Sequence, residues 1–499
     1  MPHDWKDILN EFDARSRAAR SMGADSKLER QRADGFDARQ RIDHLVDDGS
    51  FRELGTLVGG LGDNGVATPA DGIVGGLASI DGRPVVVAAE DFTVLGGSIG
   101  FGNHAKRLRF ATIALQETIP FVILLEGAGE RATNAMHRHP YAPNDLQVLA
   151  QLRGKVPTVA LVMGSSAGHG ALSGVLMDFI VMTDSAALFS AGPPLVEAAL
   201  GEKVDKQDLG GAKIHTQKSG VAHNRVATDA EAFSLARDYL SYMPSSSLEL
   251  PPAPVTAMHQ DDGCIENILE LVPRDIDRPY DMKAVISRLV DDNEFLEVQP
   301  DFGRSMLTGY ARLDGHACGI VANQPMILAG AINRAAAEKA ARFLRVAGDF
   351  NLPVVFLADN PGVLPGTAAE ADGTLLAAAN MFMAQSRLRS PKLHVTLRKA
   401  FGFGSSIMAM NPFDRQTLTL AFPGATLGGI PATSGADAAA LDADAKATLE
   451  QAEDAACWRS ADTMAYDEII DPRELRNYLV AGLSASRGHR IQPAGPLSD

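Results

Sequence analysis

The chain has 499 residues, 45% of them apolar and 22% charged, which is ordinary globular composition with ample material for large cores. Its 46 basic and 62 acidic side chains give a formal net charge of −16, which argues against non-specific nucleic-acid binding. The cysteines Cys264, Cys318 and Cys457 lie far apart, which excludes a CxxC metal knuckle and a disulfide framework. No apolar run reaches the roughly 18 residues of a membrane span, and the N-terminal residues lack a signal region. We therefore expect a cytoplasmic protein with no membrane association.

In chain order, apolar strands alternate with helical segments in each half of the sequence. The first half predicts strands at 83–90, 120–125 and 158–163, with an amphipathic helix at 105–117. The second half predicts a helix at 336–350 and strands at 353–358 and 394–398. Short, nearly continuous apolar strands are typical of mainly parallel sheets covered by helices. Each half is therefore predicted to be an α/β domain.

The two halves repeat one another. The segment "GLASIDG" at 76–82 returns as "GYARLDG" at 309–315, an offset of 233 residues. The same offset continues without a gap through several glycines, prolines and a lysine, pairing Gly97 with Gly330, Lys106 with Lys339 and Pro120 with Pro353. Such a constant register indicates a tandem duplication. The boundary falls in the Pro- and Ser-rich stretch Met243–Val255, which predicts domains at 1–255 and 256–499.

A loop of small residues follows an apolar strand in each half. These loops are "MGSSAGHGALSG" at 163–174 and "RKAFGFGSSIMAM" at 398–410, with glycine pairs Gly168/Gly170 and Gly402/Gly404. A strand–glycine loop–helix joint leaves the first N–H groups of the helix free to approach a ligand. Two such donors on one carbonyl oxygen form an oxyanion hole, worth roughly 3–4 kcal/mol per donor in acyl transfer. Alternatively, the small residues only let helix and strand pack closely, but two equivalent loops suit a reaction between two bulky partners.

No other catalytic motif competes with these loops. The sequence has no GxGxxG after a first strand, no GxxxxGK[ST] and no HExxH. Ser165, Ser166 and His169 suggest a nucleophile and a base, but residues so close in one loop rarely reach triad geometry, and no acid partner is evident.

The chain resembles the β-type carboxyltransferase subunits of biotin-dependent acyl-CoA carboxylases, such as propionyl-CoA and methylcrotonoyl-CoA carboxylases. The resemblance covers nearly the whole chain, and its most specific stretches are EDFTVLGGSIG, LEGAGER, LGEKVDKQDLGGAKIHTQKSGVAH, GIVANQP, LAGAINRAAAEKAARFLR, NPGVLPGT and RKAFGFG. It implies two crotonase-like domains, with the acyl-CoA at the first and biotin at the second. It also implies transfer of a carboxyl group from carboxybiotin to the α-carbon of an acyl-CoA through an enolate.

The resemblance assigns roles to the two loops. The amides of Gly168 and His169 would hold the thioester oxygen, and those of Phe403 and Gly404 the ureido oxygen of biotin. This sequence has His169 and Phe403 where the family has glycines, and we expect the backbone donors to survive both changes. The imidazole of His169 is then either a pocket wall or a proton-transfer group, and Phe403 is either a hydrophobic wall or a stacking platform.

The resemblance also implies a set of substrate-binding residues. Ser406 falls where the family lines the acyl-chain pocket. Lys106 and Arg131 lie near glycine loops, where they either meet CoA phosphates or are simply solvated. The remaining expected positions are the loop glycines Gly129, Gly170, Gly362 and Gly402.

The resemblance implies partners but no metal. The sequence "YDMKAV" around Lys283 lacks the second methionine of a biotinyl-lysine site, and no ATP-binding glycine loop is present. Biotin and its carboxylation are therefore expected on a separate biotin carboxylase and carrier subunit. The resemblance further implies a homo-oligomer, a hexamer, with active sites shared between subunits. Two alternatives stay open: another crotonase-like reaction on an acyl thioester, such as decarboxylation or hydrolysis, and a non-catalytic complex partner.

Overall fold

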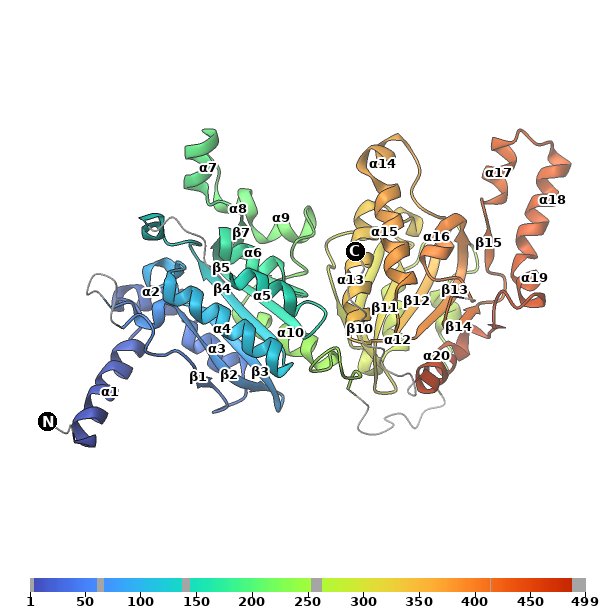
Figure 1. The fold of residues 1–499 in the computed structure, drawn as a ribbon. Helices are drawn as coiled ribbons and strands as arrows, with labels where there is room; N and C mark the ends of the chain where they lie inside the picture. Colours follow the sequence, from blue (N-terminus) through green and yellow to red (C-terminus); the bar gives the residue numbers. More distant parts are fainter. Residues whose placement is uncertain (1–3, 61–66, 137–143, 253–262, 413, 487–499) are drawn as a thin grey trace. The chain divides into compact units, whose positions relative to one another are not determined.

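The computed structural model describes residues 4–60, 67–136, 144–252, 263–412 and 414–486. The chain divides into two compact units, Met1–Ser247 and Leu248–Asp499. The division falls inside the linker stretch Met243–Val255. In each unit a mainly parallel sheet is covered by helices (Figure 1), as the alternation of strands and helices predicts.

The first unit contains one sheet with the order β1-β2-β3-β4-β5-β6-β8, and β7 pairs with β5. The β1–β2 and β2–β3 pairs are antiparallel, and the other pairs are parallel. The strands are β1 Arg52–Glu53, β2 Ile73–Ile80, β3 Arg83–Glu90, β4 Phe121–Gly127, β5 Thr158–Ala167, β6 Phe179–Thr183, β7 Ala187–Phe189 and β8 Asn224–Val226. The helices are α1 Trp5–Arg20, α2 Asp25–Asp34, α3 Ala38–Leu45, α4 Phe101–Glu117, α5 Asp145–Leu152, α6 Gly168–Val175, α7 Pro193–Leu200, α8 Lys206–Gly210, α9 Ala212–Gln217 and α10 Asp229–Tyr242.

The second unit repeats this topology strand for strand, in the order β16-β14-β13-β12-β11-β10-β9 with β15 paired to β13. The strands are β9 Phe295–Glu297, β10 Met306–Leu313, β11 His316–Asn323, β12 Val354–Asn360, β13 Lys392–Phe401, β14 Gln416–Ala421, β15 Thr426–Gly428 and β16 Glu468–Ile469. The helices are α11 Ile268–Leu271, α12 Met282–Leu289, α13 Arg334–Asp349, α14 Thr367–Asp372, α15 Thr374–Ser386, α16 Gly402–Ile407, α17 Ala432–Ala438, α18 Ala443–Asp454, α19 Ala456–Asp462 and α20 Leu475–Ala485.

The duplication extends to individual hydrogen bonds. In the first unit the carboxylate of Asp47 accepts from the amides of Asp81 and Gly82, at the turn of the β2–β3 hairpin. In the second unit Asp291 accepts from the matching amides of Asp314 and Gly315. The same polar clamp therefore fixes the hairpin in both units.

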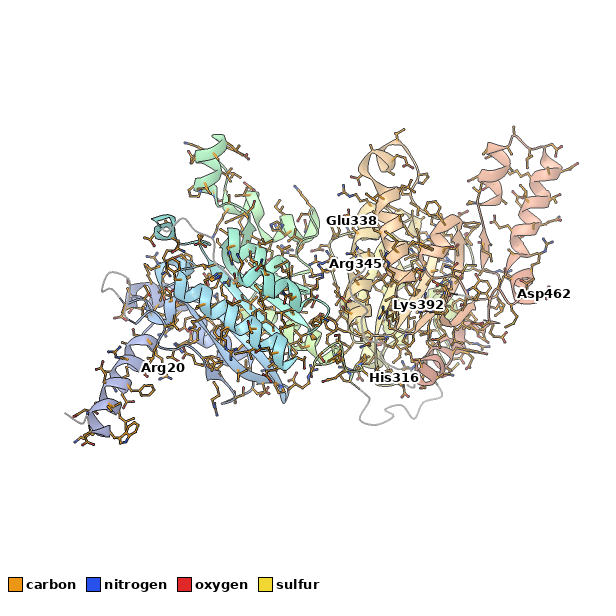
Figure 2. All side chains as sticks on the ribbon, viewed as in Figure 1. Arg20, His316, Glu338, Arg345, Lys392 and Asp462 are labelled. Carbon is orange, nitrogen blue, oxygen red and sulfur yellow. The ribbon has the colours of Figure 1, made fainter. Side chains whose placement is uncertain are left out.

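The central parallel strands form the core of each unit. The β5 side chains from Val159 to Val162 are fully buried, as are those of β12 from Val354 to Ala358. Side chains fill the space between sheet and helices, and Lys392, at the start of β13, has only 1% of its surface exposed (Figure 2). Within the described ranges, no helix is long and apolar enough to span a bilayer. The buried parallel strands place their carboxyl ends, and the glycine loops that follow, at one edge of each sheet.

Candidate functional site

The first glycine loop joins β5 directly to α6. Gly168 begins the helix with φ +54, a conformation that side chains disfavour. The neighbouring loop approaches so closely that a Cβ on Gly129, which has φ +81, would lie 2.6 Å from the Ala167 carbonyl oxygen. The first amides of α6 have no partners within the helix. The loop can therefore offer backbone N–H groups to a carbonyl oxygen, as the sequence predicts.

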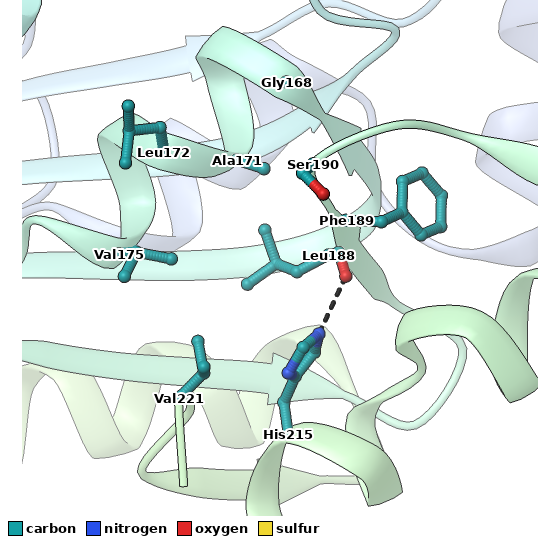
Figure 3. Close-up of a pocket in the computed structure, with 9 residues that line it drawn as sticks. All are labelled: Gly168, Ala171, Leu172, Val175, Leu188, Phe189, Ser190, His215 and Val221. Atoms are coloured by element: carbon teal, nitrogen blue, oxygen red, sulfur yellow. Dashed lines mark hydrogen bonds between the residues drawn. The ribbon is translucent and has the colours of Figure 1, made fainter. Parts of the chain in front are cut away.

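A cavity of about 380 Å³ lies beside Gly168 (Figure 3). Its lining is mostly apolar and comes from α6, β7 and the segment that contains α9: Gly168, Ala171, Leu172, Val175, Leu188, Phe189, Ser190, His215 and Val221. The Nε2 atom of His215 lies 2.7 Å from the Leu188 carbonyl oxygen, which fixes this ring against β7. The cavity can therefore hold the apolar part of a ligand whose polar part lies at Gly168.

The imidazole of His169 has an acid partner that the sequence did not reveal. Its Nε2 lies 2.7 Å from Oδ1 of Asp145, the first residue of α5, and the Asp145 side chain is fully buried. Nδ1 of His104, on α4, lies 3.4 Å from the same oxygen. This acid partner is not evident in the sequence, because Asp145 comes from a helix 24 residues earlier in the chain.

Two further charged groups lie behind Asp145. Nε of the buried Arg107 lies 3.8 Å from Asp145 Oδ2, and its Nη2 lies 3.0 Å from Glu90 Oε1. Burial raises the pKa of Asp145, but the hydrogen bond from His169 and the charge of Arg107 outweigh it and hold the pKa below its ordinary value. Burial raises the pKa of Glu90, although Arg107 opposes the shift. The surroundings of Asp145 therefore favour its ionised form.

The donor set of His104, Asp145 and His169 also fits a metal ion in principle. The three ligand atoms lie within 4.8 Å of one another. However, the guanidinium of Arg107 already places a buried positive charge beside the carboxylate, where a divalent cation would be repelled. We therefore interpret this cluster as a hydrogen-bonded network.

The two basic residues expected near the first loop are held inside the unit. Lys106 has 4% of its surface exposed, and its Nζ donates to the carbonyl oxygens of Ala70 and Ile73. Burial lowers the pKa of Lys106 to about 8. Arg131 lies 2.7 Å from a carboxylate oxygen of Asp71 and donates to the Ser98 carbonyl oxygen. In this structure the Lys106 ammonium is not placed to meet a phosphate, whereas the Arg131 side chain stays partly exposed.

The second glycine loop repeats the geometry of the first. Gly402 begins α16 with φ +58, directly after the last residue of β13. A Cβ on Gly404 would lie 2.6 Å from Oδ1 of Asn360 and 2.8 Å from Cα of Gly362. Gly362, with φ +118, therefore packs its backbone against the loop, and its amide donates to the same Asn360 oxygen.

The remaining predicted residues of the second unit differ in exposure. Phe403 has 54% of its surface exposed, and Ser406 is half-buried. The Ser406 carbonyl oxygen accepts hydrogen bonds from the side chains of Gln385 and Asn411. Phe403 can therefore contact a ligand, while Ser406 is tied to α15.

The structure thus brings together two separate groups of predicted residues. In the first unit Gly129, Gly168, His169 and Gly170 surround the end of β5, and in the second Gly362, Gly402 and Gly404 surround the end of β13. Ser166 is fully buried, which does not suit the role of a nucleophile. Sequence reasoning missed Asp145, His215 and Asn360. For the last two the one available signal was their position in or next to the family-like stretches LGEKVDKQDLGGAKIHTQKSGVAH and NPGVLPGT.

Known proteins resemble the whole chain. The model of the carboxyl transferase domain matches residues 30–494. The propionyl-CoA carboxylase beta chain of Cereibacter sphaeroides is 37% identical over 413 residues, covering 81% of this chain and 80% of that protein. The methylmalonyl-CoA decarboxylase subunit alpha of Veillonella parvula is 34% identical over 490 residues, covering 96% and 95%.

A solved structure gives the same result for the fold. The crystal structure of transcarboxylase 12S, a hexamer with hydrolysed methylmalonyl-CoA bound, matches with a TM-score of 0.90 at 30% identity and covers 98% of both chains. The match extends over both units and confirms the predicted fold of two crotonase-like domains. The chain therefore belongs to the carboxyl transferase family and is an enzyme, a carboxyltransferase component of the acyl-CoA carboxylase type.

Proposed function

We propose that the chain transfers a carboxyl group from carboxybiotin, carried by a separate subunit, to the α-carbon of an acyl-CoA. The observation that supports this most is the pair of equivalent strand–glycine–helix joints, in which Gly168 and Gly402 have φ +54 and +58. Two loops that offer backbone donors suit a reaction in which two oxygen atoms gain negative charge. The names of the relatives, among them propionyl-CoA carboxylase, point to an acyl-CoA as substrate.

The first unit holds the acyl thioester in this proposal. The amides of Gly168 and His169 donate to the thioester oxygen and stabilise the enolate that forms when the α-proton leaves. The apolar cavity beside Gly168 receives an apolar portion of the substrate. Arg131 is the basic residue that remains partly exposed near this loop, and it can meet a CoA phosphate.

The second unit receives the carboxylated cofactor. Its loop fits the ureido ring in one respect, because the glycines at 362, 402 and 404 leave the backbone uncovered by side chains. A Cβ at Gly404 would collide with Asn360. Carboxybiotin supplies the carboxyl group when it is bound there. The amides of Phe403 and Gly404 donate to the ureido oxygen, Phe403 covers the ring, and Ser406 faces the acyl chain.

The proposal includes the assembly and the partners. We expect a homo-oligomer, as in the hexamer of transcarboxylase 12S, that works in the cytoplasm with a biotin carboxylase and carrier subunit. Helix α1 supports the oligomer, because its apolar side chains recur at helical spacing and form one face that stays exposed within the described residues: Trp5, Ile8, Leu9 and Phe12.

Transfer of the carboxyl group in the reverse direction is a second candidate function. The relative from Veillonella parvula is named a methylmalonyl-CoA decarboxylase subunit, and it matches 96% of this chain. The same two loops would serve the reverse transfer, because the enolate is common to both directions. The rate of carboxyl transfer to the acyl-CoA and the rate of the reverse transfer from the carboxylated acyl-CoA, measured separately, distinguish the two candidates.

The first prediction tests the thioester hole. The purified chain is mixed with a biotin carboxylase and carrier subunit, ATP and labelled bicarbonate. We expect the label to appear in the carboxyl group that is added to the α-carbon of the acyl-CoA. Gly168→Pro removes an N–H donor and requires φ near −65° where the structure has +54, so we expect kcat/KM to fall by at least about 100-fold.

The matched control is Gly201→Pro at the end of α7. Gly201 also has positive φ, +71, and its N–H bonds to the Glu197 carbonyl oxygen. We expect this variant to retain its carboxyl transfer. Full activity of Gly168→Pro, or equal losses in both variants, would contradict the proposed hole.

A further inference from the structure

The imidazole of His169 has a defined orientation beside the proposed thioester hole. It belongs to the residue whose amide is the second donor of that hole, and it lies in the first turn of α6. The fully buried carboxylate of Asp145 holds its Nε2 at 2.7 Å. The side chain of His169 keeps 14% of its surface exposed, so protons can exchange with water. A side chain that only lined a pocket would need no buried carboxylate behind it.

The charged groups around the pair fix which ring nitrogen is basic. Asp145 stays ionised because His169, Arg107 and His104 outweigh the effect of its burial on its pKa. An ionised carboxylate accepts a hydrogen bond, so Nε2–H of His169 donates to Asp145, and Nδ1 is the ring nitrogen that does not face this carboxylate. Behind Asp145, Arg107 is paired with Glu90. The arrangement is that of a histidine base oriented by a carboxylate.

We propose that His169, oriented by Asp145, is a general base that removes the α-proton of the bound acyl-CoA, so that the chain exchanges this proton with solvent when no biotin carrier is present. This inference rests on the proposed function of the Gly168–His169 hole. It adds an activity, enolisation of an acyl thioester, that does not require the second glycine loop.

The step balances without a further reactant. Nδ1 of His169 takes the α-proton, the C–H electron pair becomes the C=C bond of the enolate, and the carbonyl pair moves to oxygen. The amides of Gly168 and His169 hold the enolate oxygen, and Asp145 stabilises the imidazolium. Solvent exchanges the proton on Nδ1, and the reverse step returns a different hydrogen to the α-carbon. Each turnover in D₂O therefore replaces one α-hydrogen by deuterium.

The test incubates the full chain with propionyl-CoA in D₂O, without carrier, ATP or bicarbonate, and follows α-deuteration by NMR. We expect exchange well above the uncatalysed rate. His169→Ala should lower exchange at least about 100-fold, the usual contribution of a general base. Added imidazole should restore part of the exchange to this variant, which a merely structural role would not allow. His44→Ala, in an exposed position on α3, is the matched control and should exchange as the unmodified chain does.

Asp145 acts as a positioning residue, and its test separates orientation from folding. Asp145→Asn keeps the shape of the side chain, but its amide can donate to Nε2 and so leave the proton on Nδ1. We expect kcat for exchange to fall while KM for propionyl-CoA stays within about threefold, and thermal melting shows whether the fold persists. Imidazole should not rescue this variant, because the blocked ring of His169 still fills the site.

Three results would overturn the proposal. In the first result, a chain that carboxylates acyl-CoA with the carrier shows no exchange above background. In the second, His169→Ala exchanges as fast as the unmodified chain. In the third, EDTA abolishes the exchange and zinc restores it. Failure of the proposed function looks different: Gly168→Pro would then keep carboxyl transfer.

Discussion

Two lysines, one in each unit, lie inside the protein with their ammonium groups bonded to backbone carbonyls. Lys339 has 1% of its surface exposed and donates to the carbonyl oxygens of Phe302 and Met306, at 3.1 and 2.8 Å. Lys106 does the same in the first unit with Ala70 and Ile73. Burial lowers the pKa of Lys339 to about 7. The duplication thus preserved a pair of buried bases whose charge costs folding free energy.

The second prediction concerns the pH dependence of stability at Lys339. A folded pKa near 7 and an unfolded value of 10.5 mean that the unfolded chain binds more protons between these values. The free energy of unfolding therefore rises with pH in this range, by up to about 1.4 kcal/mol per pH unit from this one group. Urea unfolding from pH 7 to 9 should show the unmodified chain gaining stability relative to Lys339→Met.

The exposed Lys203 supplies the control for this measurement. Its side chain is 82% exposed, so Lys203→Met should give a pH profile parallel to that of the unmodified chain. If Lys339→Met also gave a parallel profile, the lowered pKa of Lys339 would be contradicted.

At the scale of elements, each glycine loop depends on the contact between two strand ends. In the second unit the loop after β12 touches the first turn of α16 through Gly362 and Gly404. The side chain of Asn360 bridges the contact, since its Oδ1 accepts from the Gly362 amide and its Nδ2 donates to Asn323. In the first unit, Gly129 touches Ala167 at the same place. The direction in which the α16 amides point thus follows from close backbone packing.

The third prediction adds one methyl group to this contact. The Cβ of Gly404→Ala would lie 2.6 Å from Asn360 Oδ1 and 2.8 Å from the Gly362 backbone, so α16 must shift. We expect about 1–3 kcal/mol of destabilisation. We also expect a drop of at least about tenfold in kcat for carboxyl transfer, with acyl-CoA binding retained, because the first unit is untouched. Steady-state kinetics and thioester binding measure the two effects.

Gly429→Ala is the matched control in the second unit. A Cβ at Gly429 meets nothing within 4 Å, so this variant should keep both stability and kcat. A Gly404→Ala enzyme with normal kcat would contradict the assignment of the second loop to the reaction.

At the scale of the whole molecule, one chain contains two copies of the same strand–glycine–helix joint, one in each unit. Sheet order, the hairpin clamps at Asp47 and Asp291 and the buried lysines all repeat between the units. The residue between the two glycines differs between the loops, with His169 in the first and Phe403 in the second. We propose that the first loop of one subunit and the second loop of another subunit together form each active site.

The fourth prediction is subunit complementation. Gly168→Pro should inactivate the first loop and Gly404→Pro the second, so each variant alone should lack carboxyl transfer. If one subunit supplies the first loop and another the second, mixed oligomers contain some sites with two intact loops and regain part of the activity. Activity is measured after mixing under conditions of proven subunit exchange. No regain under those conditions, or full activity of a monomer, would contradict shared sites.

Local pattern alone determined much of this protein. The constant offset of 233 residues established the duplication, and apolar runs gave the strands β3, β4, β5, β12 and β13 and the helices α4 and α13. The glycines at 168 and 402 indicated two loops with special backbone geometry, and both have positive φ. These features are readable because strand, helix and turn preferences act between residues close in the chain.

The tertiary structure decided which polar side chains meet. The sequence offers no local signal that Asp145 holds His169, because the contact depends on where the starts of α5 and α6 come together. Likewise, Lys106 resembles a surface base in the sequence, and its burial follows from packing of α4 over the carbonyls of Ala70 and Ile73. Such contacts join residues far apart in the chain, and only the close packing of helices on the sheet selects the partner.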